Sequence, residues 1–156
     1  MCSDRKALTR LALMVAFAAL VGVRQADAAQ CTISTTSVVF GTYNVFNTAP
    51  ADSTGTVMYR CNGGARNIAI MISKGASPVY FARVMLKGSD FLGYNLYRDA
   101  ARTSIWGDGS SGTSAHFEAD PPNNQNIVVT VFGRVPAGQD VRAGSYSDTV
   151  SIEINF

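Results

Sequence analysis

The chain has 156 residues, of which 47% are hydrophobic and 15% are charged, and its formal net charge is +2. The first 28 residues hold four of the 13 basic residues and two of the 11 acidic ones, so residues 29–156 carry nine of each. A neutral chain of this kind gives no support for a nucleic acid or an anionic membrane as the partner.

The N-terminal segment is typical of a secretory signal peptide. Three basic residues precede the apolar run Leu11–Val23, and an A-x-A sequence ends at Ala28. We expect cleavage after Ala28 or Ala29, which removes residues 1–28 and leaves residues 29–156 as one secreted domain. The apolar run is short for a membrane-spanning helix, so we expect no integral membrane segment after cleavage. An uncleaved N-terminal anchor is the alternative.

Cleavage also removes Cys2 and leaves Cys31 and Cys61 as a pair. Because exported proteins meet an oxidising compartment, we expect a disulfide between these two residues. Closing a loop of this length would stabilise the domain by about 3–4 kcal/mol. Two free buried thiols are the alternative. Two thiols and one histidine do not make a four-ligand metal site, and no cofactor is expected.

Short runs of alternating apolar and polar residues follow, and no segment has a helical period over ten residues. The expected strands cover residues 37–46 with a kink at Gly41, 54–61, 67–73, 83–88, 91–99, 126–135 and 146–156. Turns rich in Gly, Asn, Asp and Pro separate them. The polar stretch 103–124 is expected to be a surface loop that carries a short strand or has a binding role. This pattern predicts an all-β sandwich or barrel.

Residues that could carry chemistry are few. His116 is the only histidine, and no nucleophile motif such as G-x-S-x-G accompanies it, so we expect a solvated loop histidine and no enzyme activity. Trp106 opens the sequence WGDG. It is interpreted as a core residue that closes a tight turn or, alternatively, as a surface platform for binding sugars. Asp108 alone supplies too few oxygens for calcium.

The chain ends on its most regular alternating run. Val150, Ile152, Ile154 and Phe156 alternate with polar residues, which predicts a half-buried strand with one apolar face.

Taken together, these segments resemble the spore coat protein U domain family, which includes subunits of archaic chaperone–usher pili. The matching pieces are Cys31, FGTY at 40–43, TGTVMYRC at 54–61, ISKG at 72–75, YNLYRD at 94–99, WGDG at 106–109, VFGRVPAGQ at 131–139 and AGSYSDTVSIEINF at 143–156.

The resemblance implies an immunoglobulin-like β-sandwich that lacks its last strand. In such subunits a periplasmic chaperone lends a strand, and at the outer-membrane usher the N-terminal extension of the next subunit replaces it. The open groove in this chain would be bordered by the final strand. Its lining would be the apolar set Val150, Ile152, Ile154 and Phe156, with the Phe156 carboxylate as an anchor for basic residues of the chaperone.

The segment before the first mature cysteine departs from the family pattern. Only Ala29 and Gln30 precede Cys31 after cleavage, and two residues are too short to fill the groove of another subunit. We therefore expect a chain that accepts a strand but does not donate one, at a pilus tip or outside a polymer.

The sequence thus predicts a non-enzymatic structural or adhesive pilus subunit. It would pass through the periplasm to the cell surface, with a periplasmic chaperone, an outer-membrane usher and other pilus subunits as partners. Two alternatives stay open at this point. One is a free-standing secreted spore-coat or surface-matrix protein, and the other is a secreted carbohydrate-binding module that uses Trp106.

Overall fold

The computed structural model describes residues 28–156, so the predicted signal peptide lies outside the described residues except for Ala28. The strands and the one short 3-10 turn are β1 (Gln30–Thr36), β2 (Ala51–Asn62), β3 (Ile68–Ile72), η1 (Tyr80–Ala82), β4 (Arg83–Lys87), β5 (Asp90–Tyr97), β6 (His116–Glu118), β7 (Ile127–Val135) and β8 (Ile152–Asn155). Within this part of the chain no helix is long and apolar enough to cross a membrane. The predicted all-β fold is confirmed.

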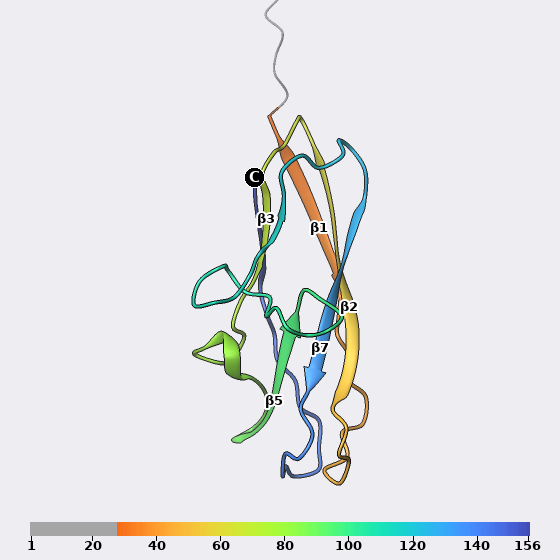
Figure 1. The fold of residues 1–156 in the computed structure, drawn as a ribbon, viewed down its shortest axis with the longest axis vertical. Helices are drawn as coiled ribbons and strands as arrows, with labels where there is room; N and C mark the ends of the chain where they lie inside the picture. The colour runs from red at the N-terminus through yellow and green to blue at the C-terminus, as the bar shows by residue number, and fades with distance from the viewer. Residues whose placement is uncertain (1–27) are drawn as a thin grey trace, which may run out of the picture.

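The strands form two sheets, in which all neighbouring strands are antiparallel. One sheet has the order β1-β2-β7-β5-β4, and the other has the order β6-β3-β8. The start of β1 and the C-terminus lie at the same end of the molecule, and the loop that follows β7 lies at the opposite end (Figure 1). The strand orders make β1 and β8 edge strands of different sheets.

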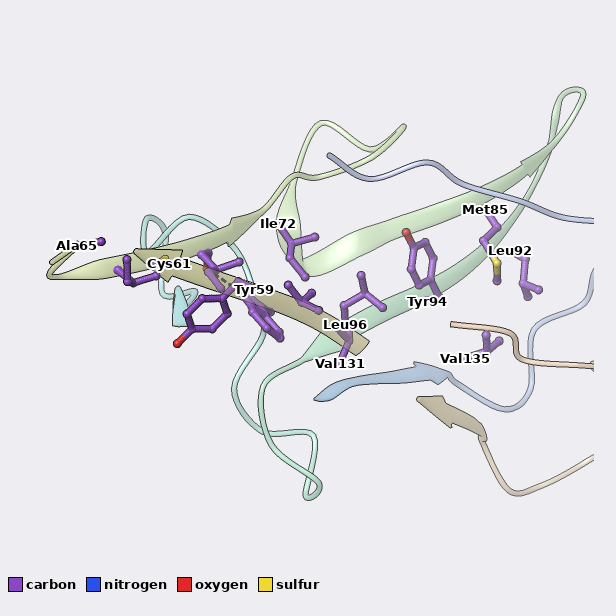
Figure 2. Close-up of a cluster of buried hydrophobic side chains, with 14 residues drawn as sticks. Tyr59, Cys61, Ala65, Ile72, Met85, Leu92, Tyr94, Leu96, Val131 and Val135 are labelled. Atoms are coloured by element: carbon purple, nitrogen blue, oxygen red, sulfur yellow. Dashed lines mark hydrogen bonds between the residues drawn. The ribbon is translucent and has the colours of Figure 1, made fainter. Parts of the chain in front are cut away.

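The core forms between the apolar faces of the two sheets. In β2 the inward residues Val57, Tyr59 and Cys61 are buried, and in β3 Ile68 and Ile72 are buried in the same alternating way. Each strand thus has the period of two that its sequence shows. Figure 2 shows the buried side chains spread along the length of the sandwich, from Ala65 and Cys61 at one end to Met85 and Leu92 at the other.

The expected disulfide joins the two sequential strands β1 and β2. Cys31 lies directly opposite Cys61 in the β1–β2 register, with their Cα atoms 4.1 Å apart. The bond therefore ties the first residues of the edge strand β1 to the buried face of its neighbour β2.

The prediction of a strand over residues 37–46 is wrong. After β1 the chain crosses the inner face of the five-stranded sheet without pairing to it. Val38 and Phe40 lie where Gly55 and Gly133 leave room, since a Cβ atom at Gly133 would come within 2.6 Å of the Val38 side chain and 2.8 Å of the Phe40 ring. Val38, Phe40 and Tyr43 are half-buried and pack against the core instead of forming a ladder, whereas Val39 and Phe46 are exposed.

The other strand predictions are confirmed, with shifted ends. β6 is the short strand that the stretch 103–124 was expected to contain. The final strand is shorter than predicted, because only Ile152–Asn155 pairs with β3. β1 was missed because its side chains are polar or exposed apart from the half-buried Cys31.

Two of the sequence motifs meet at the end opposite the C-terminus. The Tyr43 hydroxyl donates to the Pro136 carbonyl (2.9 Å) and accepts from the Gln139 amide (3.0 Å). The Gln139 side chain in turn accepts from the Gly93 amide (2.7 Å) and donates to the Gly93 carbonyl (2.9 Å). These bonds fix the loop after β7 against β5.

Candidate functional site

The candidate site is the free edge of β8. Within residues 28–156, β8 pairs with β3 alone, in a register that places Ile154 opposite Ile70 and Ile152 opposite Ile72. Because directly paired residues share a face, Ile152 and Ile154 point toward the core together with their buried partners. Both are only half-buried, as is Val150 just before the strand. Phe156 follows the strand and is 52% exposed.

The start of the final segment is fixed to the far edge of the other sheet. Ser147 and Leu86 of β4 exchange two backbone hydrogen bonds, of 2.8 and 3.1 Å. Asp148 accepts hydrogen bonds from the Tyr94 hydroxyl (2.7 Å) and the Ala76 amide (3.0 Å). Burial, and then this carboxylate, raise the pKa of Tyr94, so it stays a neutral donor. The segment is therefore held in place before it reaches β8.

At the opposite edge of the five-stranded sheet, the core-facing side of β1 is also incompletely covered. Ile33 lies opposite Tyr59 in the β1–β2 register and shares its face. Tyr59 is 1% exposed, whereas Ile33 is 36% exposed. Apolar side chains that face the interior are thus incompletely covered at β1 as well as at β8.

A fully buried arginine, which the sequence analysis missed, supports the end of β3. The Arg83 guanidinium donates to the carbonyls of Ser73 (2.8 and 3.0 Å) and Trp106 (2.7 Å) and to the side-chain oxygen of Asn95 (2.7 Å). It also lies 5.3 Å from the centre of the Tyr80 ring. Burial lowers the pKa of Arg83. The available signal was that Arg83 shares one face of β4 with the apolar Met85, two residues further on.

The structure contradicts a surface role for Trp106. Its side chain is fully buried, and its indole N–H donates to the Ile70 carbonyl at 2.9 Å. A sugar-stacking platform needs an exposed ring face, so the carbohydrate-binding prediction for this residue is wrong. The alternative interpretation, a core tryptophan beside a tight turn, is confirmed.

His116 is not the solvated loop residue that the sequence suggested. It lies on β6 opposite the buried Ile70, with its ring 6.2 Å from that of Tyr59 and 6.1 Å from that of Trp106, measured between ring centres. Its Nε2 atom is buried and has no hydrogen-bond partner within residues 28–156. Burial, and then the charge of Arg98, lower the pKa of His116, while Glu118 opposes this shift.

We expect stability to fall as the pH drops below the ordinary pKa of histidine, about 6.5. The folded state keeps His116 neutral, because its pKa is lowered, whereas the unfolded state takes up a proton. The stability that neutral His116 contributes is therefore fully present above about pH 6.5 and is lost as the pH falls toward the lowered pKa. Urea unfolding at pH 7.5, 6.5 and 5.5 measures this. His116→Gln should have a flatter profile than the native protein, and an unchanged profile would contradict this account.

Comparisons with known proteins agree with this architecture. The family model of the Spore Coat Protein U domain matches residues 17–153. The chain belongs to this family. Protein U of Myxococcus xanthus is 41% identical over 68 residues, which are 44% of this chain and 36% of that protein. The chain therefore matches little more than a third of the length of this curated relative.

A solved structure similar to this spore coat protein U domain is the CsuC–CsuE chaperone–tip adhesion subunit pre-assembly complex from the archaic chaperone–usher Csu pili of Acinetobacter baumannii. A chain of that complex superimposes with a TM-score of 0.51 and 22% identity, over 83% of this chain and 40% of the other. At this identity the likeness shows the fold alone, an all-β sandwich of two sheets.

The described part of this family member offers no metal centre. No group of three or more His, Cys, Asp or Glu side chains in residues 28–156 lies close enough together to hold a metal ion. The chemistry available at the β8 edge is that of backbone hydrogen bonding and apolar contact.

Proposed function

We propose that this protein is a non-enzymatic subunit of a chaperone–usher surface pilus, and that it accepts a β-strand from another chain along the free edge of β8. One observation carries the proposal: the final strand is an edge strand whose core-facing residues Ile152 and Ile154 are only half-covered. Membership of the spore coat protein U domain family and the fold shared with a chain of a chaperone–pilus subunit complex support it.

The occupant of this edge is an extended segment with alternating apolar side chains. An edge strand presents unpaired backbone N–H and C=O groups, which a further strand can satisfy. The apolar side chains of the donor would cover Ile152, Ile154 and, across the interior, Ile33. A periplasmic chaperone supplies the strand first, and a neighbouring subunit replaces it at the outer-membrane usher.

A terminal position in the pilus follows if the signal peptide is cleaved after Ala28. Gln30 already pairs with Asn62 in the β1–β2 ladder, and Cys31 is held by the disulfide. The first residues of the mature chain, from Gln30 to Thr36, are then already paired with β2 in their own domain. We propose that the protein accepts a strand without donating one, as a subunit at the tip or in another terminal position of a pilus would.

A pair of matched variants tests strand acceptance. Ile152→Asp puts a charge on the core-facing side of β8, whereas Asn155→Asp puts the same charge on its exposed side. We expect capture by a periplasmic chaperone from the same genome, measured by co-purification, to fall at least tenfold in Ile152→Asp only. The reason is that a carboxylate buried under a donor strand costs several kcal/mol.

The opposite outcome is also informative. If the mature domain without a chaperone is a monomer that unfolds cooperatively, and neither variant alters chaperone capture, the strand-acceptance proposal fails. A free-standing coat or surface-matrix protein would then explain the fold better.

A further inference from the structure

A second feature lies at the end of the molecule opposite the C-terminus. A hollow of about 680 Å³ separates the turn of the β4–β5 hairpin from the loop that follows β7. We call it the hairpin hollow; its lining residues are Ser89, Asp90, Phe91, Gln139, Asp140 and Val141, joined by Arg142 and Tyr146. Figure 1 shows the blue loop after β7 at this end, away from the C-terminus. The volume of the hairpin hollow is in the range of small-molecule sites.

The two walls of the hairpin hollow are fixed to each other. On one side, the Gln139 side chain makes two hydrogen bonds with the backbone of Gly93. On the other side the Lys87 ammonium donates to the Ala143 carbonyl at 2.6 Å and lies 5.7 Å from the centre of the Tyr146 ring. A ligand would therefore meet a preformed surface, which limits the entropy lost on binding.

The lining combines an exposed aromatic ring with polar groups. Phe91 is 65% exposed, although it lies in a strand next to buried residues. Asp140 is exposed and makes no ion pair among the described residues. The Arg142 side chain is 82% exposed, with its guanidinium 3.8 Å from the Asp90 carboxylate. The Phe91 ring, the Asp140 carboxylate as an acceptor and the Arg142 guanidinium as a donor thus line the same hollow.

The charges restrict the class of ligand. Asp90 and Asp140 contribute two negative charges to the lining, and Arg142 contributes one positive charge. The Lys87 ammonium lies 3.8 Å from the Asp90 carboxylate and balances the one negative charge that remains. A surface with this balance offers little attraction to an anion. An entirely apolar ligand would leave these charged groups without partners.

We propose that the hairpin hollow binds a neutral saccharide. A pyranose ring has an apolar face of C–H groups, which the electron-rich face of Phe91 attracts. Its hydroxyl groups both donate and accept, so they can donate to the Asp140 carboxylate and accept from the Arg142 guanidinium. This inference goes beyond strand acceptance and does not depend on it, because the hairpin hollow and the β8 edge use different residues.

The test measures binding of the purified secreted chain, together with any co-purified chaperone, to immobilised neutral oligosaccharides of glucose, galactose and mannose. Sialylated and sulfated glycans and bare polystyrene are included as comparison surfaces. We expect binding to at least one neutral oligosaccharide, reduced at least tenfold in Phe91→Ala and in Asp140→Asn. Phe117→Ala, which removes a similarly exposed ring (58%) from β6, should bind like the native chain.

Four results would overturn the proposal: no neutral glycan bound, binding to acidic glycans only, binding to polystyrene only, or glycan binding unchanged in both variants. Phe91 and Asp140 are both exposed, so their variants should fold and unfold like the native domain. They should also keep normal chaperone capture, which distinguishes failure at the hairpin hollow from failure at the β8 edge.

Discussion

Replacing Arg83 by alanine is expected to destabilise the domain by about 3–5 kcal/mol, measured by urea unfolding. The native side chain is fully buried and supplies hydrogen bonds to the Ser73 and Trp106 carbonyls and to Asn95. Each buried acceptor left without a donor costs about 1–3 kcal/mol, and the lost side-chain volume adds a cavity. Because natural domains are stable by only about 5–15 kcal/mol, this is a large fraction of the total.

Two further variants separate the effect of the lost hydrogen bonds on stability from the effect of the lost side-chain volume. Arg83→Met restores much of the volume but none of the hydrogen bonds, so it should remain strongly destabilised. Arg60→Ala is the matched control, since Arg60 is exposed and its guanidinium bonds only the Asn124 side chain among the described residues. It should cost less than about 1 kcal/mol. Native stability in Arg83→Met would show that the buried hydrogen bonds contribute little.

Removing the disulfide with the double replacement Cys31→Ser and Cys61→Ser is expected to cost about 2–4 kcal/mol. The bond restricts the unfolded chain, and it also holds the N-terminal end of β1, whose other side chains are exposed. Urea unfolding gives the total loss. Hydrogen exchange should show that backbone amides of β1 lose protection more than those of the central strand β7.

Cys2→Ser serves as the control, because we predict that Cys2 is removed with the signal peptide. It should leave stability unchanged and the mature mass unaltered. A mature native chain that reacts with thiol reagents at Cys31 or Cys61 before reduction would contradict the predicted compartment. Uniform protection of β1 in the double variant would show that pairing with β2 alone holds this strand.

The sequence alone was sufficient for the fold class and the disulfide. Alternation is a local property, so runs such as 54–61 and 126–135 predict strands wherever they lie. The disulfide followed because only two cysteines remain after Ala28, and the structure places them opposite each other. The inward direction of Ile152 and Ile154 likewise followed from the period of two.

Only the tertiary structure decided which segment covers which part of the core. Alternation shows that residues 37–46 have an apolar face, but Gly55 and Gly133, distant in sequence, make the room that turns Val38 and Phe40 into core residues. The burial of Trp106 and the inward position of His116 depend in the same way on contacts with distant strands.

The same limit applies to the two candidate sites. In the described part of the chain, β8 has a free edge because it pairs with β3 alone, and the hairpin hollow lies between two loops that the Gln139–Gly93 hydrogen bond connects. Local sequence records the preference of each residue for water or the interior. Which residues meet is decided by packing between segments tens of positions apart, and no short run of sequence shows it by itself.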